Sequence, residues 1–326
     1  MTDVVPARGR MSSLARPWPR PQQWTGWATA LLIAVVAVFA LTTHRFLTWS
    51  NIKAILNSAS MVGIMALGLT FVTMVGSVVS LAVAEVAVIA GMAFLATLGL
   101  GLFPALLIAM ALGAAVAAAQ GVLIGAWGAN PVILTIAAAF VIDGIAQGIN
   151  SGAIVQPATG AYGSLNSTPL GVPVAVYVLV GLALALQYLA RGTVLGRQIT
   201  LVGANRAAAR AAGLPVTRVI TLAFGISGAA FGLGGAFLGA YNTGASTLLE
   251  GTVTFNAIAA VLVGGTSIAG GHGSPLRTLW GALAISAIAD LLLLRGFGTG
   301  PQVLVEGVLV LLVVIATQAR NRTRGA

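Results

Sequence analysis

Long apolar runs separated by short polar stretches make up most of this chain. A helix that crosses the hydrocarbon core of a bilayer needs about 20 mainly apolar residues, and the pattern contains runs of about that length throughout. The stretch at 57–100 is the hardest to divide, because Gly76, Ser77 and Ser80 offer its only break. About ten membrane-spanning segments are predicted, at 24–42, 58–78, 82–99, 103–125, 132–150, 172–189, 219–240, 255–270, 276–294 and 301–317.

The composition supports membrane-spanning helices. Of the 326 residues, 58% are hydrophobic and 7% are charged, with a mean hydropathy of +1.02, whereas a soluble domain is about 45–50% apolar and about 25% charged. The chain therefore cannot cover its surface with polar groups, and we expect an all-α integral membrane protein. Because the chain contains no cysteine, disulfides and thiolate metal sites are excluded. We expect no metal and no cofactor.

The basic residues lie at the ends of apolar runs, so the net charge of +10 indicates membrane orientation rather than binding to nucleic acid. With ten spans and a cytoplasmic N-terminus, only Arg45, Lys53 and Arg295 of the sixteen basic residues fall outside. Both termini are therefore predicted to be cytoplasmic. The chain is predicted to have a cytoplasmic tail at 1–23, a transmembrane domain at 24–317 and a second cytoplasmic tail at 318–326. The transmembrane domain includes a basic cytoplasmic loop at about 190–218.

One short helix with a start and a stop signal lies in the basic loop. Asn205 is a good N-cap residue, "RAAARAA" (206–212) has high helix propensity, and Gly213 suits the position just after a helix. Arg206 and Arg210 are four positions apart and share one face. So short a helix is marginal alone in water, which predicts that it docks either in a groove of a partner protein or on anionic lipid headgroups.

Several ordered pieces of the chain resemble the permease family of bacterial ATP-binding-cassette (ABC) importers for monosaccharides, the family of the ribose-transporter permeases. Together they cover more than three-quarters of the chain. The pieces are "FLTWSNIKAIL" (46–56), "NPVILTIAAAFVIDGIAQGINSG" (130–152), "GRQITLVGANRAAARAAGLPV" (196–216), "SGAAFGLGGAFLGA" (227–240) and "NAIAAVLVGGTSIAGGHGS" (256–274).

The resemblance implies an ABC-importer permease architecture in the bacterial inner membrane. Its expected partners are a cytoplasmic ATP-binding subunit, a second permease subunit in a homodimer or heterodimer, an extracytoplasmic sugar-binding protein and membrane lipid. It also favours the partner-protein interpretation of the loop, because the loop of this family carries a coupling helix that docks on the ATPase. The residues expected to form this coupling surface are Gly203, Asn205, Arg206, Ala208, Arg210 and Gly213.

The chain departs from the family pattern at two acidic stretches. Family members usually carry "GGIDLS" after the second span, whereas this chain has "GSVVSLAVAE" (76–85), with Ser80 in place of the aspartate. Before "AIAAV" the family tends to have Glu-Leu-Asp, where this chain has Thr254, Phe255 and Asn256. Both changes remove negative charge near the expected pathway, and they leave the identity of the sugar open.

No nucleotide-binding motif is present in the sequence. A P-loop requires a lysine after its second glycine, and the only lysine is Lys53, in "NIKAIL". The glycine-rich "GGTSIAGGHGS" (264–274) joins two predicted spans, so it indicates a tight turn, with His272 as a solvated loop residue. If transport is driven by ATP, a separate chain must hydrolyse it, and we expect no enzymatic activity in this one.

Polar residues within the predicted spans are few. Asp143, Gln147 and Asn150 share a helix face by their spacing of four and three, and with Asn256 they are candidates for lining the substrate pathway. A structural network between helices explains the same pattern equally well. The G-x-x-x-G pairs in "GISGAAFGLGGAFLG" (225–239) permit close helix contact, either within the subunit or at a dimer interface.

An ion-coupled secondary transporter of a small polar solute is the alternative function. It would require discontinuous helices and ion-coupling acids near the middle of the membrane, for which Asp143 and Glu306 are candidates. No inverted repeat is apparent in the sequence. The capped helix in the basic loop discriminates between the two functions, because a secondary transporter has no use for it.

Overall fold

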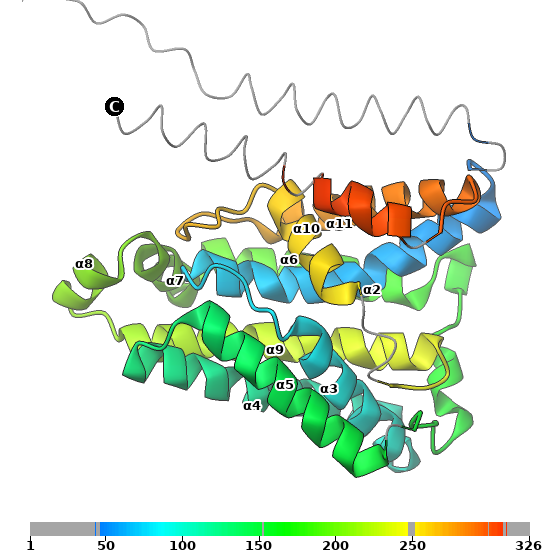
Figure 1. Cartoon of the computed structure of the whole chain (residues 1–326), viewed down its shortest axis with the longest axis horizontal. Coiled ribbons are helices and arrows are strands. Elements are labelled where there is room, and N and C mark those ends of the chain that lie inside the picture. Colours follow the sequence, from blue (N-terminus) through cyan, green and yellow to red (C-terminus); the bar gives the residue numbers. More distant parts are fainter. Residues whose placement is uncertain are drawn as a thin grey trace, which may run out of the picture. The chain divides into compact units, whose positions relative to one another are not determined.

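The computed structural model describes residues 43, 46–151, 153–246, 252–298, 300–308 and 311. The predicted span at 24–42 and the two predicted tails lie outside these residues, as does most of the second half of the span at 301–317. Every regular element within them is helical. The helices are α2 (Trp49–Met74), α3 (Val83–Thr97), α4 (Leu102–Trp127), α5 (Pro131–Asn150), α6 (Val174–Gly192), α7 (Val194–Ala204), α8 (Arg206–Ala211), α9 (Val216–Tyr241), α10 (Val253–Val263) and α11 (Pro275–Leu294), with 3-10 helices η1 (Leu98–Leu100), η2 (Gly160–Ser164) and η3 (Pro169–Gly171) (Figure 1).

Seven helices within the described residues are long and apolar enough to cross a bilayer: α2, α3 with η1, α4, α5, α6, α9 and α11. They match seven of the predicted spans to within a few residues, except that α2 begins earlier, at Trp49. Residues 300–308 are also helical. The all-α membrane architecture is therefore confirmed.

The prediction of a membrane span at 255–270 is wrong. The helix there, α10, has 11 residues, roughly 16 Å of length, against a hydrocarbon core of about 30 Å. Gly264 ends it, and the backbone then turns through positive φ angles at Gly265, Gly270 and Gly271. The glycine-rich segment thus forms the predicted turn, and His272 is exposed as expected, but the turn begins too early to leave a full-length helix.

The basic loop holds two helices, whereas the sequence predicted one. Helix α7 begins where the Thr193 hydroxyl accepts a hydrogen bond from the amide of Gly196, at 3.2 Å. Its residues alternate between apolar and polar at helical spacing, and Ile199 and Val202 are fully buried. Since α7 packs against α6, α9 and α2, the loop is a folded part of the subunit.

Helix α9 forms the centre of the bundle and packs against α4, α3 and α2. Its contact with α4 is made between backbones, because a Cβ atom added at Gly228 or Gly232 would overlap the carbonyl oxygen of Gly113 or Ala109. A Cβ at Gly235 would likewise overlap the carbonyl of Ala87 on α3. The G-x-x-x-G pairs of α9 therefore serve packing within the subunit.

The described residues contain two copies of one arrangement. In the first copy, the long α2 is followed by an irregular segment, the shorter α3, and then α4 and α5. In the second copy, the long α9 leads through a connecting segment to the shorter α10, then to α11 and the helix at 300–308. The contacts correspond as well, since α4 packs on α9 as α11 packs on α2, and α3 packs on α9 as α10 packs on α2.

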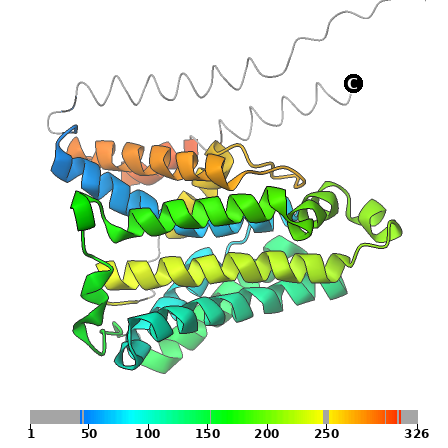
Figure 2. The same cartoon turned by 180° about the vertical axis from the view of Figure 1, so that it is seen from behind.

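The two copies run in opposite directions. Helix α2 ends, and α9 begins, at the end of the bundle that carries α7 and α8 (Figures 1 and 2). Helices α3 and α10 both begin near the middle of the bundle, α3 running away from the α8 end and α10 toward it. The structure thus contains an inverted repeat within the described residues that was not apparent in the sequence. This architecture is typical of transporters, whose substrate sites lie where interrupted helices meet near the membrane midplane.

Candidate functional site

Helix α8 has the predicted signals at both ends. The side-chain oxygen of Asn205 accepts a hydrogen bond from the amide of Ala208 at 3.0 Å. After the helix, Gly213 takes a φ of +79°, and the amide of Leu214 donates to the carbonyl of Ala209 at 3.0 Å. The six-residue helix is thus fixed by its own flanking residues, and it projects from one end of the bundle (Figure 1).

The two arginines of α8 have different surroundings. Arg210 is exposed, as are Ala207 and Ala208, whereas Ala209 is buried. Arg206 is half-buried, and burial lowers the pKa of its guanidinium below the ordinary value, with the positive charge of Arg210 lowering it further. Arg206 is therefore directed into the subunit, whereas Arg210 is exposed.

Arg206 contacts the segment that follows α2. One of its terminal nitrogens donates to the carbonyl oxygen of Gly76 at 3.1 Å and to the hydroxyl of Ser77 at 3.0 Å. Ser77 is fully buried, and Gly76 lies at a φ of +77°. A charged side chain thus links α8 to the interruption of the first repeat.

Four glycines bring three backbones together beside this contact, and we call Gly76, Gly203, Gly270 and Gly271 the glycine junction. The amide of Gly271 donates to the carbonyl of Met74 at 2.9 Å. A Cβ atom at Gly203 would overlap that same carbonyl, and one at Gly270 would lie 2.6 Å from the Cα of Gly76. Helix α7, the end of α2 and the turn after α10 are therefore in backbone contact. Gly203, predicted as part of the coupling surface, is buried here.

The interrupted helices meet at their N-termini. The amide of Ala84, at the start of α3, donates to the hydroxyl of Thr254, at the start of α10, at 3.0 Å. The amide of Leu81 donates to the hydroxyl of Thr135 on α5 at 3.2 Å. Ser80, where the family has an acid, is buried and accepts from the amide of Ala82 at 3.3 Å. Hydroxyl groups thus satisfy backbone amides here that no helix satisfies.

Two acid–amide pairs lie near this meeting point. On α5, Gln147 donates to the carboxylate of Asp143 at 2.8 Å, and Asp143 is close enough to Glu85 of α3 for electrostatic interaction. On α10, the amide nitrogen of Asn256 donates to both carboxylate oxygens of Glu306, whose side chain is 6% exposed. The structure therefore places the predicted pathway residues Asp143, Gln147 and Asn256 in two pairs. The side chain of Asn150 lies outside the described residues.

Sequence reasoning missed the partners of these residues. Thr254 and Asn256 stand out only as departures from the family pattern, and Glu85 and Glu306 only as isolated acids. Apart from Asp143 and Gln147, which share α5, the spacing along the chain gives no signal, because the other pairings join different helices. The signal that exists is rarity, since the whole chain has only six acidic residues, and acids within a span are expensive to bury.

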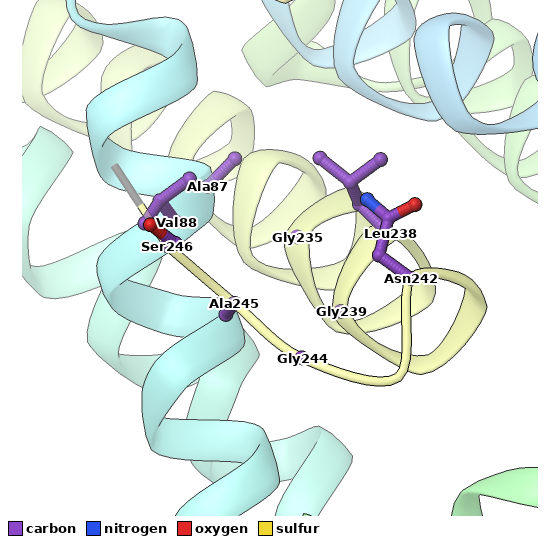
Figure 3. Close-up of a pocket in the computed structure, with 9 residues that line it drawn as sticks. All are labelled: Ala87, Val88, Gly235, Leu238, Gly239, Asn242, Gly244, Ala245 and Ser246. Atoms are coloured by element: carbon purple, nitrogen blue, oxygen red, sulfur yellow. The ribbon is translucent and has the colours of Figure 1, made fainter. Parts of the chain in front are cut away.

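At the opposite end of the bundle, the segment after α9 crosses the beginning of α3. Figure 3 shows a small cavity there, with Gly244 to Ser246 facing Ala87 and Val88 of α3 and the end of α9. Ala245 forms a two-way backbone bridge with Val155, at 3.0 and 2.9 Å. This bridge fastens the polar loop after α5 to the interruption of the second repeat.

Similarity to known proteins identifies the class. Residues 51–317 match the family described as the permease component of the branched-chain amino acid transport system. The ribose import permease protein RbsC of Escherichia coli (strain K12) is 30% identical over 89% of this chain and 92% of its own length. The L-arabinose ABC transporter permease protein AraH of Azospirillum brasilense is 29% identical over 91% and 88%, and RbsC of Bacillus subtilis (strain 168) is 29% identical over 89% and 91%. No solved structure matches the chain significantly.

The chain therefore belongs to the permease family of bacterial ABC importers for monosaccharides. More particularly, it is a sugar-importer permease subunit, a multi-pass protein of the bacterial inner membrane. The expected identification is confirmed, and the ion-coupled alternative is not favoured. As a family, such permeases work with an ATPase and a substrate-binding protein.

Proposed function

We propose that this chain crosses the membrane ten times, with the short α10 in place of one full-length span, and with both termini and the α8 end in the cytoplasm. The described basic residues support this orientation, because Lys53 and Arg295 lie at the opposite end of the bundle. Cytoplasmic loops carry an excess of arginine and lysine. The basic residues at the α8 end are Arg191, Arg197, Arg206, Arg210, Arg218 and Arg277.

In this proposal, α8 docks on a separate ATP-hydrolysing subunit. The observation that carries the proposal is a capped helix that projects from the bundle and presents Arg210 beside the small exposed side chains of Ala207 and Ala208. At roughly 9 Å, this helix fits a shallow groove, and small side chains allow close approach. The cation at Arg210 would pair with an acidic residue of the ATPase.

A second permease subunit, identical or related, completes the pathway. Helix α5 supports this part of the proposal, because its outer face carries the Asp143–Gln147 pair together with Gly144 and Gly148, and no described atom lies within 4 Å of a Cβ built at either glycine. A carboxylate in contact with lipid is expensive. We therefore place this face toward the partner permease and the water-filled pathway between the two.

The translocated solute is a small polar sugar, for which the pentoses named for the relatives, ribose and L-arabinose, are the first candidates. The meeting point of α3 and α10 offers hydroxyl-binding groups in Thr254, Asn256 and Glu306, and Glu85 has a carboxylate oxygen with no partner among the described residues. A sugar-binding protein would deliver the solute at the outer loops. Alternating access then requires only that the two states bind the sugar differently.

The test is to tag the chain, purify it gently from native membranes and identify the co-purifying proteins by mass spectrometry. A P-loop ATPase is expected with the wild-type chain, and Arg210→Glu should reduce its recovery by about tenfold or more. Arg197→Glu, which reverses an exposed arginine of α7, is the matched control and should retain the ATPase. Equal recovery with all three chains would refute docking through α8.

A further inference from the structure

We propose that Arg206 is a positioning residue that transmits the movement of α8 to the interrupted segment before α3, while Arg210 alone serves docking. The inference rests on the proposed docking of α8 on the ATPase. It divides between two neighbouring arginines the tasks that the sequence pattern assigned to both. Docking and transmission would then be separable by mutation.

The first ground is the direction of the two side chains. Arg206 donates to Gly76 and Ser77, about 130 residues earlier in the chain, whereas Arg210 is exposed. A half-buried guanidinium keeps its charge, and its hydrogen bonds to fixed acceptors are stronger than those between neutral groups. Arg206 therefore holds α8 to one defined place on the subunit.

The second ground is the lack of free space beside this contact. The glycine junction leaves no room for a single methyl group at Gly203 or Gly270. A close-packed contact transmits displacement instead of absorbing it. When α8 moves, the end of α7 and the segment after Met74 must therefore move with it.

The third ground is where the contacted segment leads. From Ser77 the chain reaches the buried Ser80, then Leu81, whose amide is held by Thr135, and then α3 with Glu85 in its first turn. Only a few residues separate the Arg206 contact from the meeting point with α10. The contact is thus the shortest link in the described structure between α8 and the candidate pathway.

The first experiment measures assembly and transport separately. The full complex of this chain, its co-purifying ATPase and its binding protein is reconstituted in liposomes, and uptake of radiolabelled ribose or L-arabinose is measured per ATP hydrolysed. Arg206→Gln should retain the ATPase within about twofold and lower uptake per ATP by roughly tenfold or more, within the range known for coupling between two sites. Arg210→Glu should instead lose the ATPase.

Conservative replacement and a double-mutant cycle distinguish transmission from general stability. Arg206→Lys keeps the charge but not the planar fork, so its uptake per ATP should lie between those of wild type and Arg206→Gln. Ser77→Ala should lower coupling in the wild type and have no further effect in the Arg206→Gln background, because the two residues act through one contact. Additive effects of the two substitutions would overturn the inference.

A distance measurement provides a readout that stability alone does not change. Since the chain has no cysteine, spin labels can be placed at Ala212→Cys, just after α8 and outside the docking surface, with either Val78→Cys or Leu100→Cys, all three positions being exposed. Trapping the ATPase with ATP and vanadate should leave the Ala212–Val78 distance unchanged and shift the Ala212–Leu100 distance. In the Arg206→Gln chain the distribution of the first of these two distances should broaden.

The outcomes separate the two proposals. If Arg210→Glu retains the ATPase as well as wild type does, docking through α8 is wrong. If Arg210→Glu loses the ATPase but Arg206→Gln loses it equally, Arg206 belongs to the docking surface and the inference fails. It fails also if Arg206→Gln retains the ATPase and transports with wild-type coupling, or if trapping moves Ala212 relative to Val78 when Arg206 is intact.

Discussion

The interruptions of the two repeats are held in different ways. The first, after α2, lies at the α8 end and is held by the charged side chain of Arg206 and by the close backbone contacts of the glycine junction. The second, after α9, lies at the opposite end and is held by the neutral backbone bridge between Ala245 and Val155. A small cavity adjoins the second interruption (Figure 3).

An inverted repeat places one interruption on each side of the membrane, so in our proposal each is available to a different soluble partner. The interruption after α2, which we propose to lie on the inner side, is packed tightly, as a segment that passes force should be. The outer one is held by two backbone hydrogen bonds, each worth only about 1 kcal/mol net. In our interpretation, the inner side drives the conformational change and the outer side responds to it.

The largest expected effect comes from adding one methyl group at the inner side. Gly203→Ala would drive a Cβ into the carbonyl oxygen of Met74 and to 2.7 Å from the amide of Gly271. Because both neighbours are backbone atoms, we expect a loss of about 4 kcal/mol or more in stability, the range of severe core substitutions, and little folded protein. Folded yield and apparent Tm by fluorescence-detected size exclusion check this.

The same change at the outer side is the matched control. A Cβ at Gly244 would meet a methyl carbon of Ile154 at 2.6 Å, but that side chain is 57% exposed and can rotate away. Gly244→Ala should therefore cost less than about 1 kcal/mol, because the nearest obstacle is a movable side chain and not backbone. Equal losses for the two variants would contradict the difference in rigidity.

The second prediction concerns a substitution that breaks the backbone bridge between Ala245 and Val155. Ala245→Pro removes the amide that donates to Val155, which should cost about 1–3 kcal/mol for the carbonyl left without a partner. Hydrogen exchange followed by mass spectrometry should then rise over residues 153–158 and stay unchanged over 203–213. Ile154→Ala, which leaves the bridge intact, should change neither region. A parallel rise at both ends would show that the interruptions are not independent.

The third prediction concerns the acid–amide pair of the second repeat. Glu306→Gln keeps the shape of the side chain but replaces a charged acceptor for Asn256 by a neutral one. Hydrogen bonds to a charged and to a neutral acceptor differ by about 1 kcal/mol, which corresponds to roughly a fivefold change in an equilibrium constant. Uptake should fall by that factor, with no loss of ATPase. The control is Asp290→Asn, which alters a carboxylate that accepts from Asn51 at 2.7 Å, away from the candidate pathway. Equal uptake in the two variants would remove Glu306 from the pathway.

The smallest expected effect tests whether local helix order limits coupling. Asn205→Gly removes the cap of α8 but should cost only a few tenths of a kcal/mol, because glycine is a tolerated N-cap residue. Uptake per ATP should therefore fall less than twofold. A loss as large as that of Arg206→Gln would show that α8 acts through its own helicity and not through its contact with Ser77.

The sequence predicted those features of the structure that are determined by residues close together in the chain. The long spans follow from uninterrupted apolar runs, and the ends of α8 follow from Asn205 and Gly213, which act on their own helix. The partners of Arg206 could not be predicted, because Ser77 lies 129 positions away, and helical periodicity gives only the faces of an isolated helix. The length of α10 was missed because hydropathy continues through Gly264 and Gly265, where the backbone turns.

The inverted repeat left a trace in the sequence that hydropathy does not detect. Prolines begin the corresponding helices, with Pro104 and Pro131 near the starts of α4 and α5, and Pro275 and Pro301 near the starts of α11 and the last described helix. Proline is favoured in the first turn of a helix. The spacing within the two pairs is nearly equal, but four residues amid unrelated side chains are too few to establish a repeat without the structure.

The length of the central helices has a consequence for the surrounding lipid. Helices α2, α4 and α9 have 26 residues each, or roughly 39 Å, against a hydrocarbon core of about 30 Å. Helices longer than the core must tilt or thicken the bilayer around them, and the backbone contact between α4 and α9 prevents these two from tilting independently. Acyl-chain length thus becomes a control on transport, and lipids with longer chains should favour whichever state holds this pair more upright.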